Sequence, residues 1–122
     1  MIWSYESQGI DERKTLTLIG KIFTRPTIIT DINHRIIAVN NNWINMCKYS
    51  PEEAFGNTPK MLQGQYTNTE SAFSFASDVN SGKIANASII NYKKDGTVFI
   101  NHIIGWQLGD ILIAETYSET EL

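Results

Sequence analysis

Cysteine is almost absent from this sequence, since Cys47 is the only one among 122 residues and no disulfide can form within the chain. A single thiol is typical of a reducing compartment. The N-terminus lacks the basic and apolar pattern of a signal peptide, and no apolar run approaches the length of a membrane span. We therefore expect a cytoplasmic protein that makes no membrane contact.

Basic residues are also few: 10 Lys and Arg stand against 13 Asp and Glu, which argues against a nucleic-acid partner. The two histidines, His34 and His102, do not have the spacing of a zinc site. The sequence has no glycine-rich phosphate loop, serine elbow or paired-carboxylate site. We predict no metal site, no catalytic residue and no enzymatic activity in this chain.

Hydrophobic residues make up 42% of the chain, which is enough for one folded domain. We expect residues 1–9 to be irregular and residues 11–23 to form a helix. Leu16, Ile19 and Phe23 share one face of that helix. The face either packs on its own domain or pairs two copies of the chain. We place the flanking segment at 1–21 and the domain at 22–120.

Two β-rich runs, 27–30 and 35–39, are separated by turn residues and predict an antiparallel hairpin. His34 falls at the tip of this hairpin. We expect it to face solvent there, with no role as a heme or metal ligand.

Several short helices should follow the hairpin. Asn40 is a suitable N-cap for a helix that ends near Cys47, residues 50–53 have the pattern of a capping box, and Thr58 with Pro59 begins a further turn. A second capping box at 67–70 should open a helix that ends near residue 79.

The apolar face of this last helix is ambiguous from its spacing. Val79 belongs to it, together with either Phe73 and Ala76 or Ala72 and Phe75.

Strands dominate the last third of the chain. Residues 84–92, 98–108 and a run that starts at 111 are joined by tight turns, so they predict an antiparallel meander. Residues 118–122 should form a polar tail. The whole chain therefore predicts an α+β fold, in which short helices cover one face of a five-stranded antiparallel sheet and leave a hollow between the layers.

Three segments resemble the PAS domain family from about residue 22 to residue 120. They are Thr30-Asp31 with Ile36 and Asn40, residues 46–53 with Gly56, and residues 91–96 with Asn101. Their order and spacing are more specific than any one of them alone. The resemblance implies a sensory and signalling domain that accompanies an effector, such as a histidine kinase or a diguanylate cyclase.

Within that family, residues 58–63 and 91–101 are similar to the flavin-binding segments of light-oxygen-voltage (LOV) domains. Gln63, Asn91 and Asn101 match residues that hydrogen-bond the flavin ring in LOV domains. Thr58 stands in place of an asparagine, and Thr116 stands roughly in place of a glutamine. Each lost amide removes a hydrogen bond worth on the order of 1 kcal/mol.

Two further departures affect the flavin chemistry. Pro59 replaces the cysteine that forms the light-driven adduct, so no covalent flavin adduct is expected. Lys60 replaces an arginine that holds the phosphate, and it supplies a point charge without the bidentate fork. Cys47 lies on an earlier helix and cannot take the place of the missing nucleophile. Non-covalent binding of FMN or FAD remains open.

Three residues have both a structural and a functional interpretation. Trp43 either packs in the core or lines a ligand cavity. Asn91 and Asn101 either face solvent beside a turn or point into one hollow from neighbouring strands.

Two functions therefore remain open. In the first, the chain is a sensory module whose cavity binds a small ligand. In the second, the chain is an interaction module without a ligand, and large side chains fill its core: Trp43, Met46, Met61, Phe73, Phe75 and Phe99. The two differ in whether these side chains leave a void.

Overall fold

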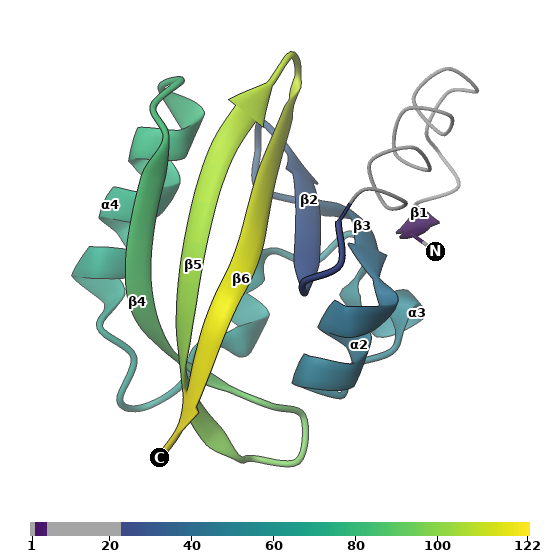
Figure 1. The fold of residues 1–122 in the computed structure, drawn as a ribbon, viewed down its shortest axis with the longest axis vertical. Helices are drawn as coiled ribbons and strands as arrows, with labels where there is room; N and C mark the ends of the chain where they lie inside the picture. The colour runs from purple at the N-terminus through teal and green to yellow at the C-terminus, as the bar shows by residue number, and fades with distance from the viewer. Residues whose placement is uncertain (1, 5–22) are drawn as a thin grey trace.

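The computed structural model describes residues 2–4 and 23–122. One antiparallel sheet forms the centre of the molecule, and its strands lie in the order β1-β3-β2-β6-β5-β4 (Figure 1). The strands are β1 (Ile2–Ser4), β2 (Thr27–Asp31), β3 (Ile36–Asn40), β4 (Ala85–Tyr92), β5 (Val98–Leu108) and β6 (Ile111–Glu121). The five predicted strands are therefore present, and the α+β prediction is confirmed.

Two expectations at the ends of the chain were wrong. Residues 2–4 are not irregular, because they pair with β3 as a sixth strand. Residues 118–121 are not a free tail, because they continue β6 and pair with the first residues of β5. The predicted helix at 11–23 lies outside the described residues except for Phe23, which is not helical.

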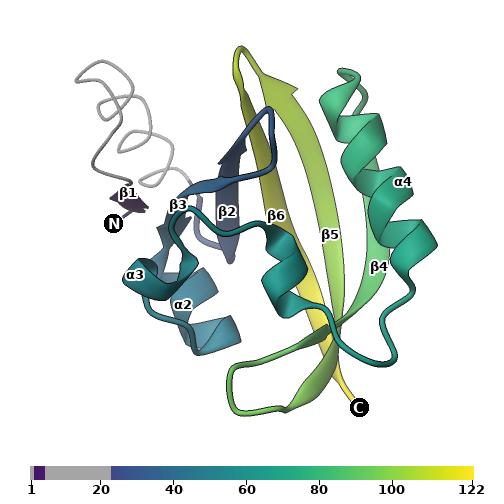
Figure 2. The same cartoon turned by 180° about the vertical axis from the view of Figure 1, so that it is seen from behind.

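The helices lie on one face of the sheet (Figure 2). They are α2 (Asn41–Cys47), α3 (Pro51–Ala54), the 3-10 helix η1 (Pro59–Leu62) and α4 (Thr69–Asn80). Their predicted starts are close to the observed ones because the signals are local. Asn40 caps α2 by accepting from the backbone N–H of Trp43, and Ser50 and Glu53 form the expected capping box at α3.

The second predicted capping box does not form. Asn68, not Thr67, is the N-cap of α4, and its side chain makes no capping bond. Its amide instead donates to the carbonyl of Ser88 at 3.1 Å and accepts from the N–H of Ile90 at 3.1 Å. Thr67 Oγ1 donates to the carbonyl of Ile90 at 2.7 Å. These residues tie the start of α4 to strand β4.

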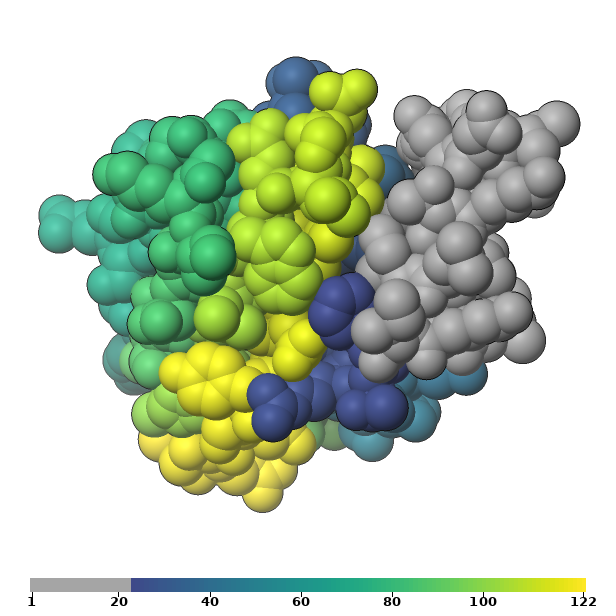
Figure 3. Space-filling model, turned by 45° about the horizontal axis from the view of Figure 1, so that its top comes forward, coloured from purple at the N-terminus to yellow at the C-terminus, as the bar shows by residue number. Residues whose placement is uncertain are grey.

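Apolar side chains pack on both faces of the sheet, because alternate residues of a strand point to opposite sides. Under the helices, one cluster joins Trp43, Met46, Cys47 and Phe99 to β2 and β3. On the outer face, a second cluster contains Ile29 and is bordered by Phe23 and Trp106. The space-filling view shows β4, β5 and β6 as adjoining bands, coloured from green to yellow (Figure 3).

Candidate functional site

A pocket of about 1000 Å³ lies between the sheet and helices η1 and α4. All seven residues that the sequence singled out for ligand binding line it: Trp43, Thr58, Lys60, Gln63, Asn91, Asn101 and Thr116. The large side chains named above therefore do not fill the interior. Trp43, Met46 and Phe99 are buried, whereas Phe73 is 74% exposed, so the alternative that places Phe73 in the core is wrong.

Trp43 lies both in the core and on the pocket wall. It is 2% exposed within the cluster under the helices, and it also lines the pocket. Asn40 holds the start of its helix in place, because the Asn40 Oδ1 atom accepts from the backbone N–H groups of both Thr27 and Trp43 at 2.9 Å.

Three buried polar side chains form a hydrogen-bonded chain across β4, β5 and β6. Thr116 Oγ1 donates to Asn101 Oδ1 at 2.7 Å, and Asn101 Nδ2 donates to Asn91 Oδ1 at 3.0 Å. Asn91 Nδ2 donates to the carbonyl of Ile90 at 3.2 Å. We call Asn91, Asn101 and Thr116 the amide cluster. The two asparagines thus point inward, not into solvent.

The amide cluster retains hydrogen-bonding capacity for a ligand. Each asparagine has two amide N–H groups and a carbonyl oxygen that accepts two bonds. Asn101 and Asn91 each use one N–H in the bonds above, so one N–H on each amide is left. Among the described residues, no buried side-chain nitrogen or oxygen lacks a partner. The cluster is therefore stable without a ligand and can still recognise a ring edge that carries both donors and acceptors.

Gln63 reaches the pocket wall because the loop after η1 is fastened to β4. Tyr92 on β4 holds this loop, because its hydroxyl accepts from the backbone N–H of Tyr66 at 2.9 Å. A Cβ atom on Gly64 would lie 2.4 Å from the Tyr92 ring, so only glycine permits this approach. The loop and Gln63 are held beside the strand that carries Asn91.

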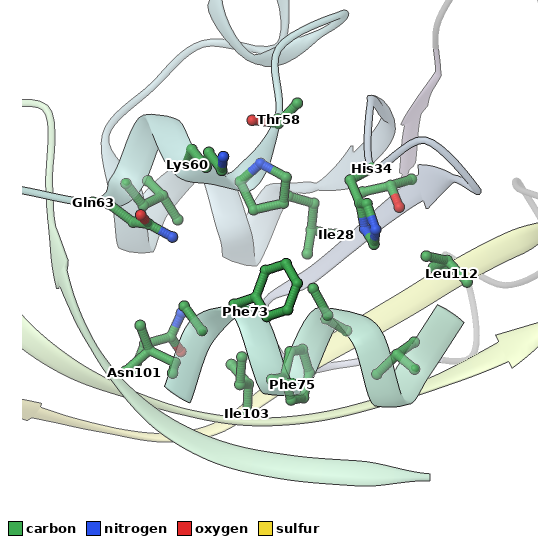
Figure 4. A pocket seen from close by; sticks show the side chains of 18 of the residues that line it. Ile28, His34, Thr58, Lys60, Gln63, Phe73, Phe75, Asn101, Ile103 and Leu112 are labelled. Carbon is green, nitrogen blue, oxygen red and sulfur yellow. The ribbon is translucent and has the colours of Figure 1, made fainter. Parts of the chain in front are cut away.

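Helix α4 forms another wall of the pocket. Of the two apolar faces that its spacing allowed, the one that contains Phe75 packs on the sheet. A Cβ atom on Gly105 would lie 2.7 Å from the Phe75 ring and 2.9 Å from Val79. Glycine at this position of β5 lets α4 pack closely on the sheet. Phe73 projects into the pocket instead (Figure 4).

Charged side chains are sparse in the pocket. Lys60 and Glu70 are the only Lys, Arg, Asp or Glu residues among the described residues that line it. Cys47 is not among these lining residues, and burial raises the pKa of its thiol. No group of His, Cys, Asp and Glu in the described part of the chain is arranged to hold a metal ion.

His34 is a pocket residue that was not predicted from the sequence. It lies at the tip of the β2–β3 hairpin as predicted, but it is half-buried and lines the pocket. The expectation of a fully solvated turn residue was therefore wrong. A hairpin signal shows where a turn falls along the chain, whereas the twist of the sheet decides what the turn covers.

Comparison with known proteins gives one family and two groups of similar proteins. A PAS domain model matches residues 24–113. A blue-light photoreceptor of Listeria monocytogenes is 35% identical over 88 residues, which cover 72% of this chain and 34% of that protein. Phototropin-1B of Oryza sativa is 30% identical over 83 residues, which cover 66% of this chain and 9% of that protein. The chain thus spans about a third or less of the length of these relatives.

Solved structures show the same fold. The LOV domain of a blue-light activated histidine kinase from Erythrobacter litoralis has a TM-score of 0.71 and 23% identity, covering 82% of this chain and 97% of that one. A Rhodobacter sphaeroides LOV protein has a TM-score of 0.79 and 14% identity, covering 93% of this chain and 69% of that one.

None of the helices in the described residues is both long and apolar enough to span a membrane.

Proposed function

The chain belongs to the PAS domain family, and from this we propose that it is a sensory module that binds a small molecule in its pocket and relays the bound state to an effector of the kinase or cyclase type. The observation that carries the proposal is a pocket of about 1000 Å³ with the amide cluster on its wall. This volume matches the upper range of small-molecule sites. The similarity to a blue-light photoreceptor and to the LOV domain of a blue-light activated histidine kinase supports sensing.

We propose FMN, FAD or a related planar heterocycle with an amide edge as the ligand. The amide cluster and Gln63 would hold the ring edge, and Thr58 and Lys60 lie on the wall of η1. Binding would be non-covalent, because Pro59 has no nucleophile and Cys47 is buried and does not line the pocket. When bound, a flavin supplies light absorption and redox chemistry that the chain's own side chains lack.

The route of the signal starts at Thr116. This residue lies on β6, which pairs with both β2 and β5 in the middle of the sheet. A ligand that accepts from the second N–H of Asn101, or donates to the second acceptor site of its Oδ1 atom, adds to the bonds with Asn91 and Thr116. Such binding changes the output only where the ligand binds one of two states more tightly.

Titration with FMN tests the ligand proposal. We expect Asn91→Ala and Asn101→Ala each to weaken FMN binding by about tenfold, the value of one hydrogen bond near 1.4 kcal/mol. Asn86→Ala is the matched control, because Asn86 lies on the same strand as Asn91 but is exposed. Unchanged affinity in both pocket variants would reject the role of the amide cluster.

We also propose that two copies pair through the N-terminal segment. Of the three residues suggested for this interface, Leu16 and Ile19 lie outside the described residues. Phe23 packs against Trp106 on the outer face of the sheet, with ring centroids 5.8 Å apart, and borders an apolar cluster there. We expect Leu16→Glu to convert a dimer into a monomer in sedimentation. A dimer that survives the substitution would reject this interface.

A further inference from the structure

His34 occupies an unusual backbone position. Its φ is +65°, in the left-handed region that is costly for most side chains. Asp31 holds the turn: its carbonyl accepts from the N–H of His34 at 3.0 Å, and its Oδ1 atom accepts from the N–H groups of Asn33 at 2.9 Å and Arg35 at 3.0 Å. The turn is thus fixed in the conformation that brings the imidazole to the pocket.

The imidazole of His34 makes no hydrogen bond with any residue that the structure describes. His102, in contrast, has both ring nitrogens engaged, with Ser88 at 2.8 Å and Thr120 at 3.1 Å. An imidazole carries at least one N–H donor in either protonation state. No buried side-chain nitrogen in the described part of the chain lacks a partner, so the ring nitrogens of His34 are open to the solvent of the pocket. The imidazole N–H is therefore available to donate to an acceptor on a ligand.

Phe73 is a second pocket residue that packs little against the described part of the chain. Its ring lines the pocket from α4 and yet is 74% exposed, whereas Phe75 packs against β5. Exposed aromatic area of this size favours a partner that covers it. A planar ring in the pocket is such a partner.

These two residues lie apart from the amide cluster. In Figure 4, Asn101 and Gln63 lie at one side of the pocket, His34 lies at the other, and Phe73 projects between them. The pocket therefore has polar side chains at both ends, and Ile28, Phe75 and Ile103 contribute apolar wall between them.

We propose that His34 and Phe73 form a second subsite, which binds the far end of an aromatic ligand that carries an acceptor oxygen, such as a carboxylate. The ring covers Phe73, and the imidazole N–H donates to the oxygen. Lys60 and Glu70 nearly cancel in charge among the described lining residues, so the pocket suits a ligand that places few charges inside it. This inference deepens the proposed function and rests on the same pocket.

Two probes separate the subsites in an NMR titration of the isotope-labelled full chain. Benzoate is the probe for His34 and Phe73, and uracil, whose edge alternates donors and acceptors, is the probe for the amide cluster. We expect benzoate to shift the signals of His34 and Phe73. We expect uracil to shift the side-chain amides of Asn91 and Asn101, with benzoate still bound.

Substitution of His34 removes the donor without backbone strain. His34→Gly keeps the positive φ, and we expect it to weaken benzoate binding roughly tenfold or more. Lys48→Gly is the matched control, because Lys48 also has a positive φ, of 71°, but does not line the pocket. His34→Asn, which tolerates the same conformation, provides a second folded variant. Phe73→Leu should reduce the preference for benzoate over cyclohexanecarboxylate, which has the same charge but no aromatic ring.

The outcomes distinguish the two proposals. Benzoate binding that is lost in His34→Gly and kept in Lys48→Gly supports the subsite. This result would stand even if uracil failed to bind and the role of the amide cluster were rejected. Absence of benzoate binding, or equal binding by wild type and His34→Gly, overturns the subsite. In that case, binding of uracil at Asn91 and Asn101 would leave the proposed function intact.

Discussion

Replacing Asn101 by alanine should destabilise the free protein as well as weaken ligand binding. The side chain is 5% exposed, accepts from Thr116 at 2.7 Å and donates to Asn91 at 3.0 Å. Its removal leaves two buried partners unsatisfied, and each costs about 1–3 kcal/mol. Because water can enter the pocket and replace part of the lost bonding, we expect a loss of about 2 kcal/mol in the free energy of unfolding.

Thr116→Val provides a graded comparison. It removes one donor and keeps the shape of the side chain, so only Asn101 Oδ1 loses a partner and the expected cost is about 1 kcal/mol. In the double variant, Asn101→Ala with Thr116→Val, the two costs should not add, because both changes break the same bond. We expect a coupling energy of about 1 kcal/mol.

Urea unfolding of the four proteins measures these values directly, with the exposed Asn86→Ala as the control. If Asn101→Ala unfolds at the wild-type urea concentration, or if the two substitutions add fully, the hydrogen-bonded chain does not stabilise the free protein. The reasoning about the amide cluster would then be refuted.

Three other substitutions or treatments test the structure. Gly105→Ala places a Cβ 2.7 Å from the Phe75 ring, so we expect a loss of about 1–3 kcal/mol on urea unfolding, and wild-type stability would contradict the close packing of α4. The ammonium of Lys94, 2.7 Å away, lowers the pKa of Glu53 below its ordinary value of 4.5. The stability that this ion pair contributes is present above pH 4.5 and is lost as the pH falls through the lower pKa that Glu53 has in the folded protein. The difference in unfolding free energy between wild type and Glu53→Gln should therefore disappear in acid. A difference that does not change with pH would contradict the ion pair. Burial raises the pKa of the Cys47 thiol. A thiol reagent should therefore label Cys47 quickly in urea and only slowly in the folded protein. Equal labelling rates would show that the thiol is accessible in the folded protein.

Much of the fold could be predicted because its signals are local. Asn40, Ser50 and Pro59 each mark a helix start through contacts within one turn, and the structure has helices at all three. The hairpins follow in the same way from turn residues between β-rich runs. Local rules failed at Asn68, whose side chain bonds to β4, about 20 residues away, and not to its own helix.

The candidate site could be predicted in part for a different reason. The resemblance to LOV domains indicated the amide cluster and Gln63, and these residues do line one pocket. It could not indicate His34 or Phe73, because neither matches a residue of that pattern. Spacing alone also left Phe73 and Phe75 equivalent, and the contact of Phe75 with Gly105 on β5 is what separates them.

Two steps on the freshly purified chain test the ligand-sensing account most directly. A visible absorption spectrum is recorded first, and the compounds released from the denatured protein are then identified by mass spectrometry. Ala76→Trp, which places a large ring on the α4 wall of the pocket, is the matched blocked variant. We expect the wild type to release a small aromatic compound that the blocked variant lacks, with a structured blue absorption band where that compound is a flavin. A wild-type protein that releases nothing beyond the blocked variant, and that binds neither FMN nor benzoate on addition, would contradict the account.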